Sequence, residues 1–128
     1  MANKRKPLKD EKSSPEGNFV LDPPSRLRQR GMSIIAVRTL REFWERHADA
    51  EQPLKAWYHE AQTSNWSTPA EIKQLYPRAD ILPGNRIVFD IKGNTYRLVV
   101  KFHYDRGIGY IRFVGTHTEY DKIDATTI

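Results

Sequence analysis

The sequence has 128 residues, a length that fits one domain with a modest buried core. It contains no cysteine, which excludes disulfide bonds and any thiolate nucleophile or metal ligand. Its formal net charge is +5, but residues 1–31 hold eight basic and four acidic side chains, so residues 32–128 are nearly neutral. Net charge alone therefore gives little support for a nucleic-acid partner.

The first 31 residues differ in composition from the rest of the chain. They carry four of the eight prolines and one short apolar cluster, Phe19–Leu21. This predicts a disordered basic extension, 1–31, before a folded domain, 32–128. The extension is an arm for RNA or the ribosome, a plain flexible leader, or a mis-assigned start, in which case translation begins at Met32. The absence of an apolar segment for a bilayer or a signal peptide predicts a cytoplasmic protein without membrane association.

The folded part is expected to begin with a strand and a helix. Ser33–Val37 is a short apolar run rich in β-branched residues, which is typical of a buried strand. Thr39 followed by Glu42 has the spacing of a capping box, which predicts a helix that runs to about residue 47. The apolar side chains at helical spacing in this segment are Leu40, Phe43 and Trp44.

Two further helices are expected before the chain changes its pattern. Pro53 suits a first helical turn, and the helix that follows should end near residue 63. Its apolar face would consist of Leu54, Trp57, Tyr58 and Ala61. Thr68 and Glu71 predict a third, short helix that is capped at Thr68 and stopped by Pro77. Its buried face would consist of Ile72, Leu75 and Tyr76.

Beyond the third helix, apolar and polar side chains alternate, which predicts strands at 86–92, 95–103 and 108–115. Gly93 and Asn94 mark a tight turn, because both tolerate positive φ. These strands predict an antiparallel β-meander with helices on one face and a partly open second face. The expected fold class is therefore α+β. The side chains expected to face the core are Ile87, Phe89, Ile91, Tyr96, Leu98, Val100, Phe102, Ile111 and Phe113.

Arg97, Lys101 and Arg112 are expected on the open face of this sheet. Arg97 has two interpretations that spacing alone does not separate. It pairs with Asp90 or Glu119 as an ordinary cross-strand contact. Alternatively, its planar fork of donors grips a phosphate.

Polar side chains follow the last strand in the segment "GTHTEYD", Gly115–Asp121. His117 has the side chain best suited to exchange a proton near neutral pH, although a polar residue at a strand end is the more common explanation. Tyr120 would lie beside His117 if a helical turn starts there, but periodicity favours a ring packed on the sheet edge. No histidine spacing fits a metal site, and no cofactor is expected. The three other histidines are His47, His59 and His103.

The segments "NRIVFDIKGNTYRLVVKFHYD" and "YIRFVGTHTEYDKID", with the expected order of elements, resemble the HigB-type toxins of the RelE/ParE superfamily. The resemblance spans Met32–Asp124 and excludes the first 31 residues. It implies a RelE-like fold and a type II toxin that cleaves mRNA without a metal, commonly on the translating ribosome. It also implies a helix-turn-helix, HigA-like antitoxin from the same operon.

The resemblance also implies roles for single residues. In RelE-like relatives an arginine on the strand after the hairpin contacts the scissile phosphate, and Arg97 matches that position. His117 and Tyr120 match the catalytic segment after the last strand. The lysine-rich strand of RelE is poorly reproduced, which leaves the general base unidentified. The residues expected to bind RNA are Arg86, Lys92, Asn94, Lys101 and Arg112.

Two other functions remain open at this point. A ParE-like toxin shares the fold but poisons DNA gyrase without nuclease activity. "GTHTEYD" favours the nuclease, because a gyrase poison needs no proton-transferring histidine after the last strand. A nucleic-acid-binding regulator is disfavoured by the nearly neutral domain and the lack of a recognition helix.

Overall fold

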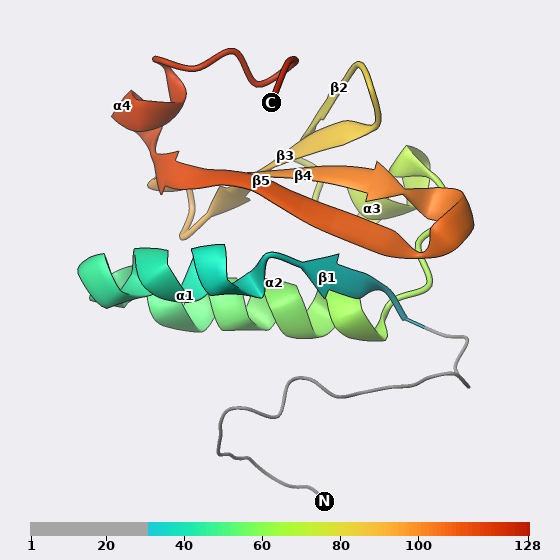
Figure 1. Ribbon diagram of the computed structural model, residues 1–128, viewed down its shortest axis with the longest axis horizontal. Helices are drawn as coiled ribbons and strands as arrows, with labels where there is room; N and C mark the ends of the chain where they lie inside the picture. The colour runs from blue at the N-terminus through green and yellow to red at the C-terminus, as the bar shows by residue number, and fades with distance from the viewer. Residues whose placement is uncertain (1–30) are drawn as a thin grey trace, which may run out of the picture. The chain divides into compact units, whose positions relative to one another are not determined.

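The computed structural model describes residues 31–128, so the predicted extension lies outside the described residues except for Gly31. Helices α1 and α2 lie side by side beneath one face of a five-stranded sheet (Figure 1). The α+β architecture is confirmed. In chain order the elements are β1 (Ser33–Ile35), α1 (Val37–Arg46), η3 (Ala48–Ala50), α2 (Glu51–Thr63), α3 (Pro69–Leu75), β2 (Asp80–Leu82), β3 (Arg86–Ile91), β4 (Tyr96–His103), η4 (Tyr104–Arg106), β5 (Ile108–Thr116) and α4 (His117–Tyr120).

The sheet has the strand order β1-β5-β4-β3-β2 and is mixed rather than wholly antiparallel. The meander of β3, β4 and β5 is confirmed, but β1 runs parallel to β5. The expectation of a buried first strand was wrong in part, since Ile34 is half-buried and Ile35 is exposed. The edge strand β2 was not predicted, because three residues are too few to show an alternating pattern.

The starts of α1 and α3 test the two predicted capping boxes. Helix α3 has the predicted cap, since the Thr68 hydroxyl accepts a hydrogen bond from the Glu71 N–H, but the Glu71 carboxylate accepts from the Ser67 N–H and not from the Thr68 N–H, so the box is incomplete. Helix α1 is not, because it begins at Val37 after Ala36, which has a left-handed φ of 73°. The Glu42 carboxylate there pairs with Arg38 instead of capping the helix. The motif alone did not reveal this, because the Thr-Glu spacing says nothing about a nearby cation that can pair with the glutamate.

The main core lies between the helices and the sheet. Trp57 packs edge-to-face on Phe89, with 5.3 Å between ring centroids. Trp57 is buried, as expected from its helix face, and Trp66 is buried as well. Trp44 and Leu75 were also expected on buried faces, but Trp44 is half-exposed and Leu75 is exposed. All the residues expected to face the core do so except Phe113. The buried residues from the sheet are Ile87, Phe89, Ile91, Tyr96, Leu98, Val100, Phe102 and Ile111.

A β-bulge in β5 explains the position of Phe113. Phe113 lies opposite Val99, and Ile111 lies opposite Val100, so Arg112 is an extra residue without a cross-strand partner. Ile111 therefore faces the helices and Phe113 faces the other side of the sheet. The expectation that both residues share one face was wrong, because strict alternation holds only in an unbroken strand.

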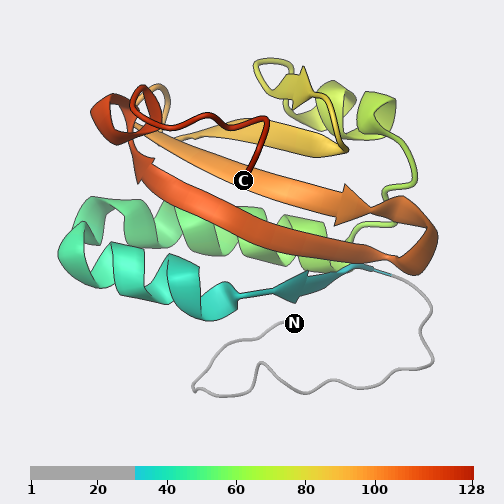
Figure 2. The same cartoon turned by 45° about the horizontal axis from the view of Figure 1, so that its top comes forward.

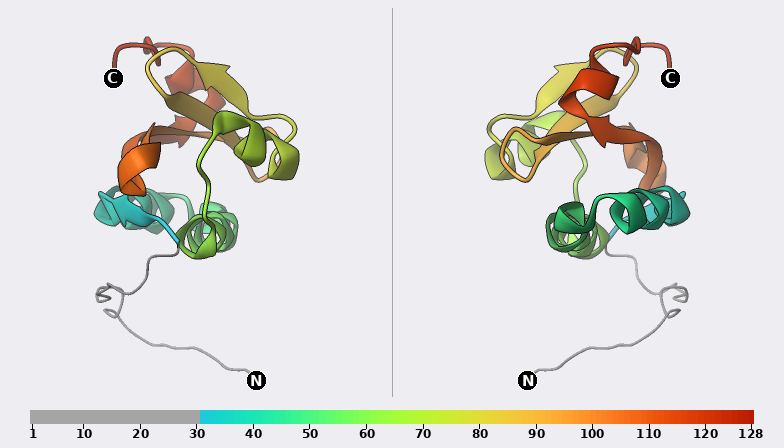
Figure 3. Two further views of the ribbon diagram at one scale, coloured as in Figure 1. Left: turned by 90° about the vertical axis from the view of Figure 1, so that its right-hand side faces the viewer. Right: turned by 90° about the vertical axis from the view of Figure 1, so that its left-hand side faces the viewer.

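The sheet face turned away from α1 and α2, here called the outer face, is covered at its centre. Residues 121–128 cross over it, as two views of the chain show (Figures 2 and 3). Val88, Val99 and Ala125 are buried there in a second small core, with Phe113 and Tyr120 packed against it. This cover divides the polar residues of the outer face into two groups.

Candidate functional site

Cross-strand register sorts the outer face into rows. One row joins Asp90, Arg97 and Gly115 on β3, β4 and β5. With His117 and Tyr120, which follow on α4, it forms what we call the Arg97 end. The apolar row of the small core comes next, and beyond it lies the Lys101 end, which consists of Arg86, Lys101, His103 and Tyr110.

Arg97 is held firmly by its neighbours. Its Nη2 donates to the Asn94 Oδ1 at 2.6 Å, and its Nη1 lies 3.4 Å from the Asp90 Oδ1. Only 12% of the side chain is exposed. The cross-strand pairing with Asp90 is therefore present, and Asn94 acts as a support for Arg97 within the described structure. Within residues 31–128 the Arg97 Nε has no hydrogen-bond acceptor.

His117 is the first residue of α4 and is placed by a reciprocal cap. The Thr116 hydroxyl accepts from the Glu119 N–H at 3.1 Å, while the Glu119 carboxylate accepts from the Thr116 N–H at 2.8 Å. The imidazole is 49% exposed, and its Nε2 lies 3.7 Å from the Asp121 carboxylate. A rigid backbone thus presents an accessible imidazole at the Arg97 end.

Gly115 makes this arrangement possible. A Cβ at this position would lie 2.5 Å from the Phe113 ring and 2.8 Å from the Glu119 carboxylate. A larger residue here would have to displace the Phe113 ring and the Glu119 carboxylate that caps α4, so glycine leaves room for both groups where β5 passes into α4.

Tyr120 packs its ring against Phe113, with centroids 6.3 Å apart, as the periodicity favoured. Burial raises the pKa of its phenol, the nearby Asp80 carboxylate adds to this, and Arg97 opposes it. A phenol with a raised pKa keeps its proton at neutral pH. Tyr120 is therefore suited to donate a hydrogen bond near Arg97 rather than to remove a proton.

Lys92 does not join the outer face, where the alternation placed it. Positive φ values at Lys92 and Gly93, rather than at Gly93 and Asn94, turn the hairpin. The Lys92 ammonium instead lies 2.7 Å from the Asp49 carboxylate in η3, which also accepts from the Tyr96 hydroxyl. Lys92 thus stabilises the contact between the hairpin and the helical layer.

Replacing Asp49 by asparagine is expected to lower stability at neutral pH and to weaken its acid dependence. Hydrogen bonds from Lys92 and then Tyr96 lower the pKa of Asp49, so its contribution is present above about pH 3.9 and is lost as pH falls through the lowered value. Urea unfolding at pH 7 and pH 3 measures this. Asp105→Asn, at an exposed carboxylate without a bonded partner in the described chain, is the control. If the difference in unfolding free energy between wild type and Asp49→Asn were the same at pH 7 and at pH 3, the assignment would be contradicted.

The Lys101 end contains residues that the sequence indicated and residues that it did not. Lys101 lies on the outer face as predicted, between Arg86 on β3 and Tyr110 on β5. The Arg86 Nε donates to the Ile128 carbonyl at 2.6 Å. Tyr110 and His103 were missed as site residues, because only the register of β4 and β5 brings them together. Arg112 is exposed at the bulge, so it does not occupy a regular position on the outer face.

Residues 31–128 lack two further features. No group of three or more histidine or acidic side chains there is placed to hold a metal ion. No helix in the same range has the length and apolar character needed to cross a bilayer.

Comparison with known proteins adds to this geometry. Residues 50–123 match the model of the HigB toxin family, described as the RelE-like toxic component of a toxin-antitoxin system. An "mRNA interferase HigB" of Escherichia coli O6:H1 is 23% identical over 94 residues, which cover 72% of this chain and 91% of that protein. The "mRNA interferase toxin HigB" of Escherichia coli K12 is 27% identical over 96 residues, covering 73% and 92%.

The family match includes β3, β4, β5 and α4, and so contains every residue of the Arg97 end and of the Lys101 end. It also covers more than half of the chain. The chain therefore belongs to the HigB family of RelE-like toxins from toxin-antitoxin systems.

Proposed function

We propose that this toxin is a metal-independent endoribonuclease that cleaves mRNA during translation on the ribosome. The observation that carries the proposal is the presence of an accessible imidazole, a largely buried guanidinium and a protonated phenol at one end of the sheet. These are His117, Arg97 and Tyr120. The names of the relatives, which are mRNA interferases, support the same activity.

The chemistry uses the RNA's own 2′-hydroxyl. Its oxygen attacks the adjacent phosphorus, the bond to the 5′ oxygen breaks, and a cyclic phosphate and a 5′-hydroxyl result. One proton must leave the 2′ oxygen and one must reach the 5′ oxygen. His117 exchanges one of these protons, a role in which a positioned group contributes about 10²- to 10⁴-fold.

Arg97 and Tyr120 stabilise the charge that accumulates on the phosphate oxygens. The Arg97 guanidinium is already oriented by Asn94 and Asp90, so little reorganisation is needed when the charge develops. The protonated Tyr120 phenol supplies a neutral donor beside it. In these roles both Arg97 and Tyr120 keep their protons and act only as hydrogen-bond donors.

Purified protein added to a translation reaction tests the activity. We expect new 5′ ends within the message by primer extension, and supercoiling by DNA gyrase should be unaffected. An intact message together with inhibited gyrase would instead support a ParE-like poison. The same assay without ribosomes, on naked mRNA, measures whether cleavage depends on translation.

The partner that we propose is a helix-turn-helix antitoxin of the HigA type, encoded beside this gene. Family membership implies an antitoxin. Co-expression with the neighbouring reading frame should restore growth and yield a complex that co-purifies. If the product of the neighbouring reading frame does not restore growth, it is not the antitoxin, and the proposed nuclease activity is unaffected.

The cap of α4 offers a test of how His117 is positioned. Thr116→Ala is expected to cost about 1 kcal/mol of stability, since it removes a cap hydroxyl, and also to lower kcat because α4 carries His117. Thr68→Ala removes the equivalent cap of α3 and should cost similar stability with kcat unchanged. Urea unfolding and single-turnover cleavage measure the two effects. Equal kcat values for the two variants would contradict the positioning role.

A further inference from the structure

The Lys101 end carries polar groups that the folded chain does not use. In residues 31–128, the Lys101 ammonium, the His103 imidazole and the Tyr110 hydroxyl have no hydrogen bond or ion pair. Arg97 and Lys92, by contrast, are both bonded to neighbouring side chains. The binding capacity of the three side chains is thus available to a ligand.

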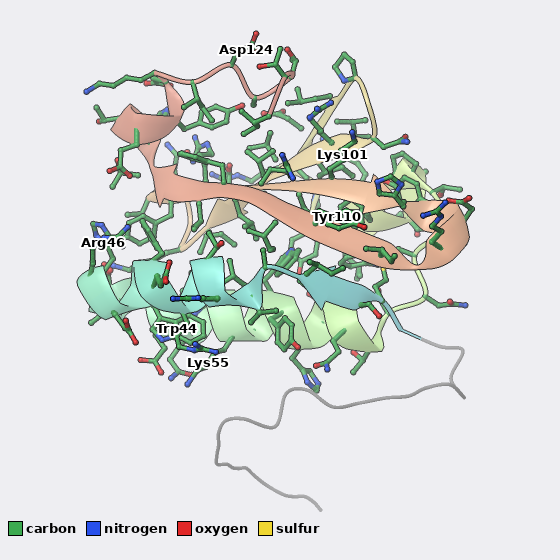
Figure 4. The ribbon with its side chains drawn as sticks, viewed as in Figure 1. Trp44, Arg46, Lys55, Lys101, Tyr110 and Asp124 are labelled. Atoms are coloured by element: carbon green, nitrogen blue, oxygen red, sulfur yellow. The ribbon has the colours of Figure 1, made fainter. Side chains whose placement is uncertain are left out.

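The three side chains are close together and ordered by the sheet. Tyr110 lies directly opposite Lys101, and its ring meets the His103 ring edge-to-face with centroids 5.2 Å apart. All three are half-buried, so their rotamers are restricted before a ligand arrives. Figure 4 labels Lys101 and Tyr110 on the sheet, away from Trp44 and Lys55 on the helices.

Packing and charge do not account for these residues. None of the three belongs to either hydrophobic core or is packed against one. Lys101 also lies directly opposite Arg86, and like charges in opposite positions destabilise a sheet. No acidic side chain in the described part of the chain pairs with Lys101. An anion bound between β3 and β5 would relieve this repulsion.

We propose that Lys101, His103 and Tyr110 form a second nucleotide site for single-stranded RNA. Tyr110 stacks on a base with its ring held by His103, and Lys101 pairs with a phosphate of the same strand. The proposal rests on the proposed nuclease function. It extends the RNA-binding role expected of Lys101 to a site with an aromatic platform.

The site binds a flanking nucleotide rather than the one that is cleaved. Lys101 is four residues beyond Arg97 on the same face of β4, a separation of about 13 Å at the usual rise of a strand. The covered apolar row lies between them. The site should therefore affect how tightly the message is bound and leave the chemical step unchanged.

Binding of a short 2′-O-methyl RNA strand, which lacks the attacking hydroxyl, measures the site separately from cleavage. In fluorescence anisotropy, Tyr110→Leu should raise Kd about tenfold, while Tyr110→Phe, which keeps the ring, should bind like wild type. Lys101→Gln should lower the slope of log Kd against log salt by about 0.7, the value for one phosphate contact. Trp44→Leu and Lys55→Gln, an aromatic and a lysine on the helical layer, should change neither quantity.

Cleavage kinetics separate this site from the proposed function. On a long message the Tyr110→Leu and Lys101→Gln variants should have a raised KM and an unchanged kcat. If wild type binds and cleaves RNA but these variants match the two controls, the second site is wrong and the nuclease stands. If wild type neither binds nor cleaves RNA, both proposals fail. Should Tyr110→Leu fail to fold by circular dichroism, the salt slope of Lys101→Gln decides.

Discussion

Replacing His117 by alanine is expected to reduce the rate of mRNA cleavage by about 10²- to 10⁴-fold and to abolish growth arrest on induction. The imidazole is half-exposed, and its contact with Asp121 is at 3.7 Å, so its removal should leave the fold and antitoxin binding intact. Single-turnover cleavage of a defined message measures the loss. Thermal unfolding and co-purification with the antitoxin measure what is retained.

The control for this variant is Asp121→Asn, which removes the neighbouring carboxylate and keeps the imidazole. That substitution is expected to change the cleavage rate far less, because the His117 and Asp121 side chains are both exposed and solvent screens their interaction. A His117→Ala protein that cleaves at the wild-type rate would exclude His117 as the group that exchanges a proton. The proton transfers would then have to be assigned elsewhere.

Replacing Arg97 by lysine is expected to lower kcat by about 10²- to 10³-fold, the range for loss of a preorganised donor at a developing oxyanion. Lysine retains the charge but lacks the planar fork that Asn94 and Asp90 hold in place. The comparison of kcat with KM is decisive here. A loss confined to KM would mean that Arg97 binds the message without acting in the transition state.

Arg97 is also part of the structure, and the measurement must allow for that. Its removal leaves the half-buried Asp90 with the exposed Arg78, 3.6 Å away, as its one ion-pair partner within residues 31–128. Arg97→Lys should therefore also lower stability, since a half-buried carboxylate with a poorer partner is costly. Asn94→Ala is the matched control: it removes the 2.6 Å bond to Arg97 but retains the guanidinium. We expect it to show an intermediate kcat at similar stability.

Elements determined by local sequence were predicted well. The alternation in β4 placed every side chain on its correct face from Tyr96 to His103. The cap of α3 at Thr68 was also correct, because a cap needs only residues within one turn. Helix α2 was expected from its apolar spacing and is present with its end at Thr63.

Elements that depend on distant partners were not predictable in the same way. The parallel pairing of β1 with β5 joins Ser33 to Ile108, and nothing in either segment specifies the other. The cover of the outer face by residues 121–128 likewise depends on Val88 and Val99, which read as exposed positions of an amphipathic strand. Burial on the second face of a sheet comes from tertiary packing, which alternation does not record.

The candidate site shows the same division. The segment after β5 was identified as polar and accessible, and the resemblance assigned roles to His117 and Tyr120. The sequence did not decide which side chains pair with Arg97, and in the structure they are Asp90 and Asn94. The pairing of Lys92 with Asp49 was missed, because it joins residues 43 positions apart across two layers.

The bulge at Arg112 also affects how this chain should be aligned with its relatives. Residues before it and after it follow two different alternating frames, so that Ile111 and Val114 face the helices while Phe113 faces away. An alignment that runs through β5 without a gap will match inward positions with outward ones wherever a relative lacks the extra residue. Deleting Arg112 would make Ile111 and Phe113 consecutive residues that alternate regularly, so the pairing of β5 with β4 on both sides of the bulge, and with it the position of His117, should be kept.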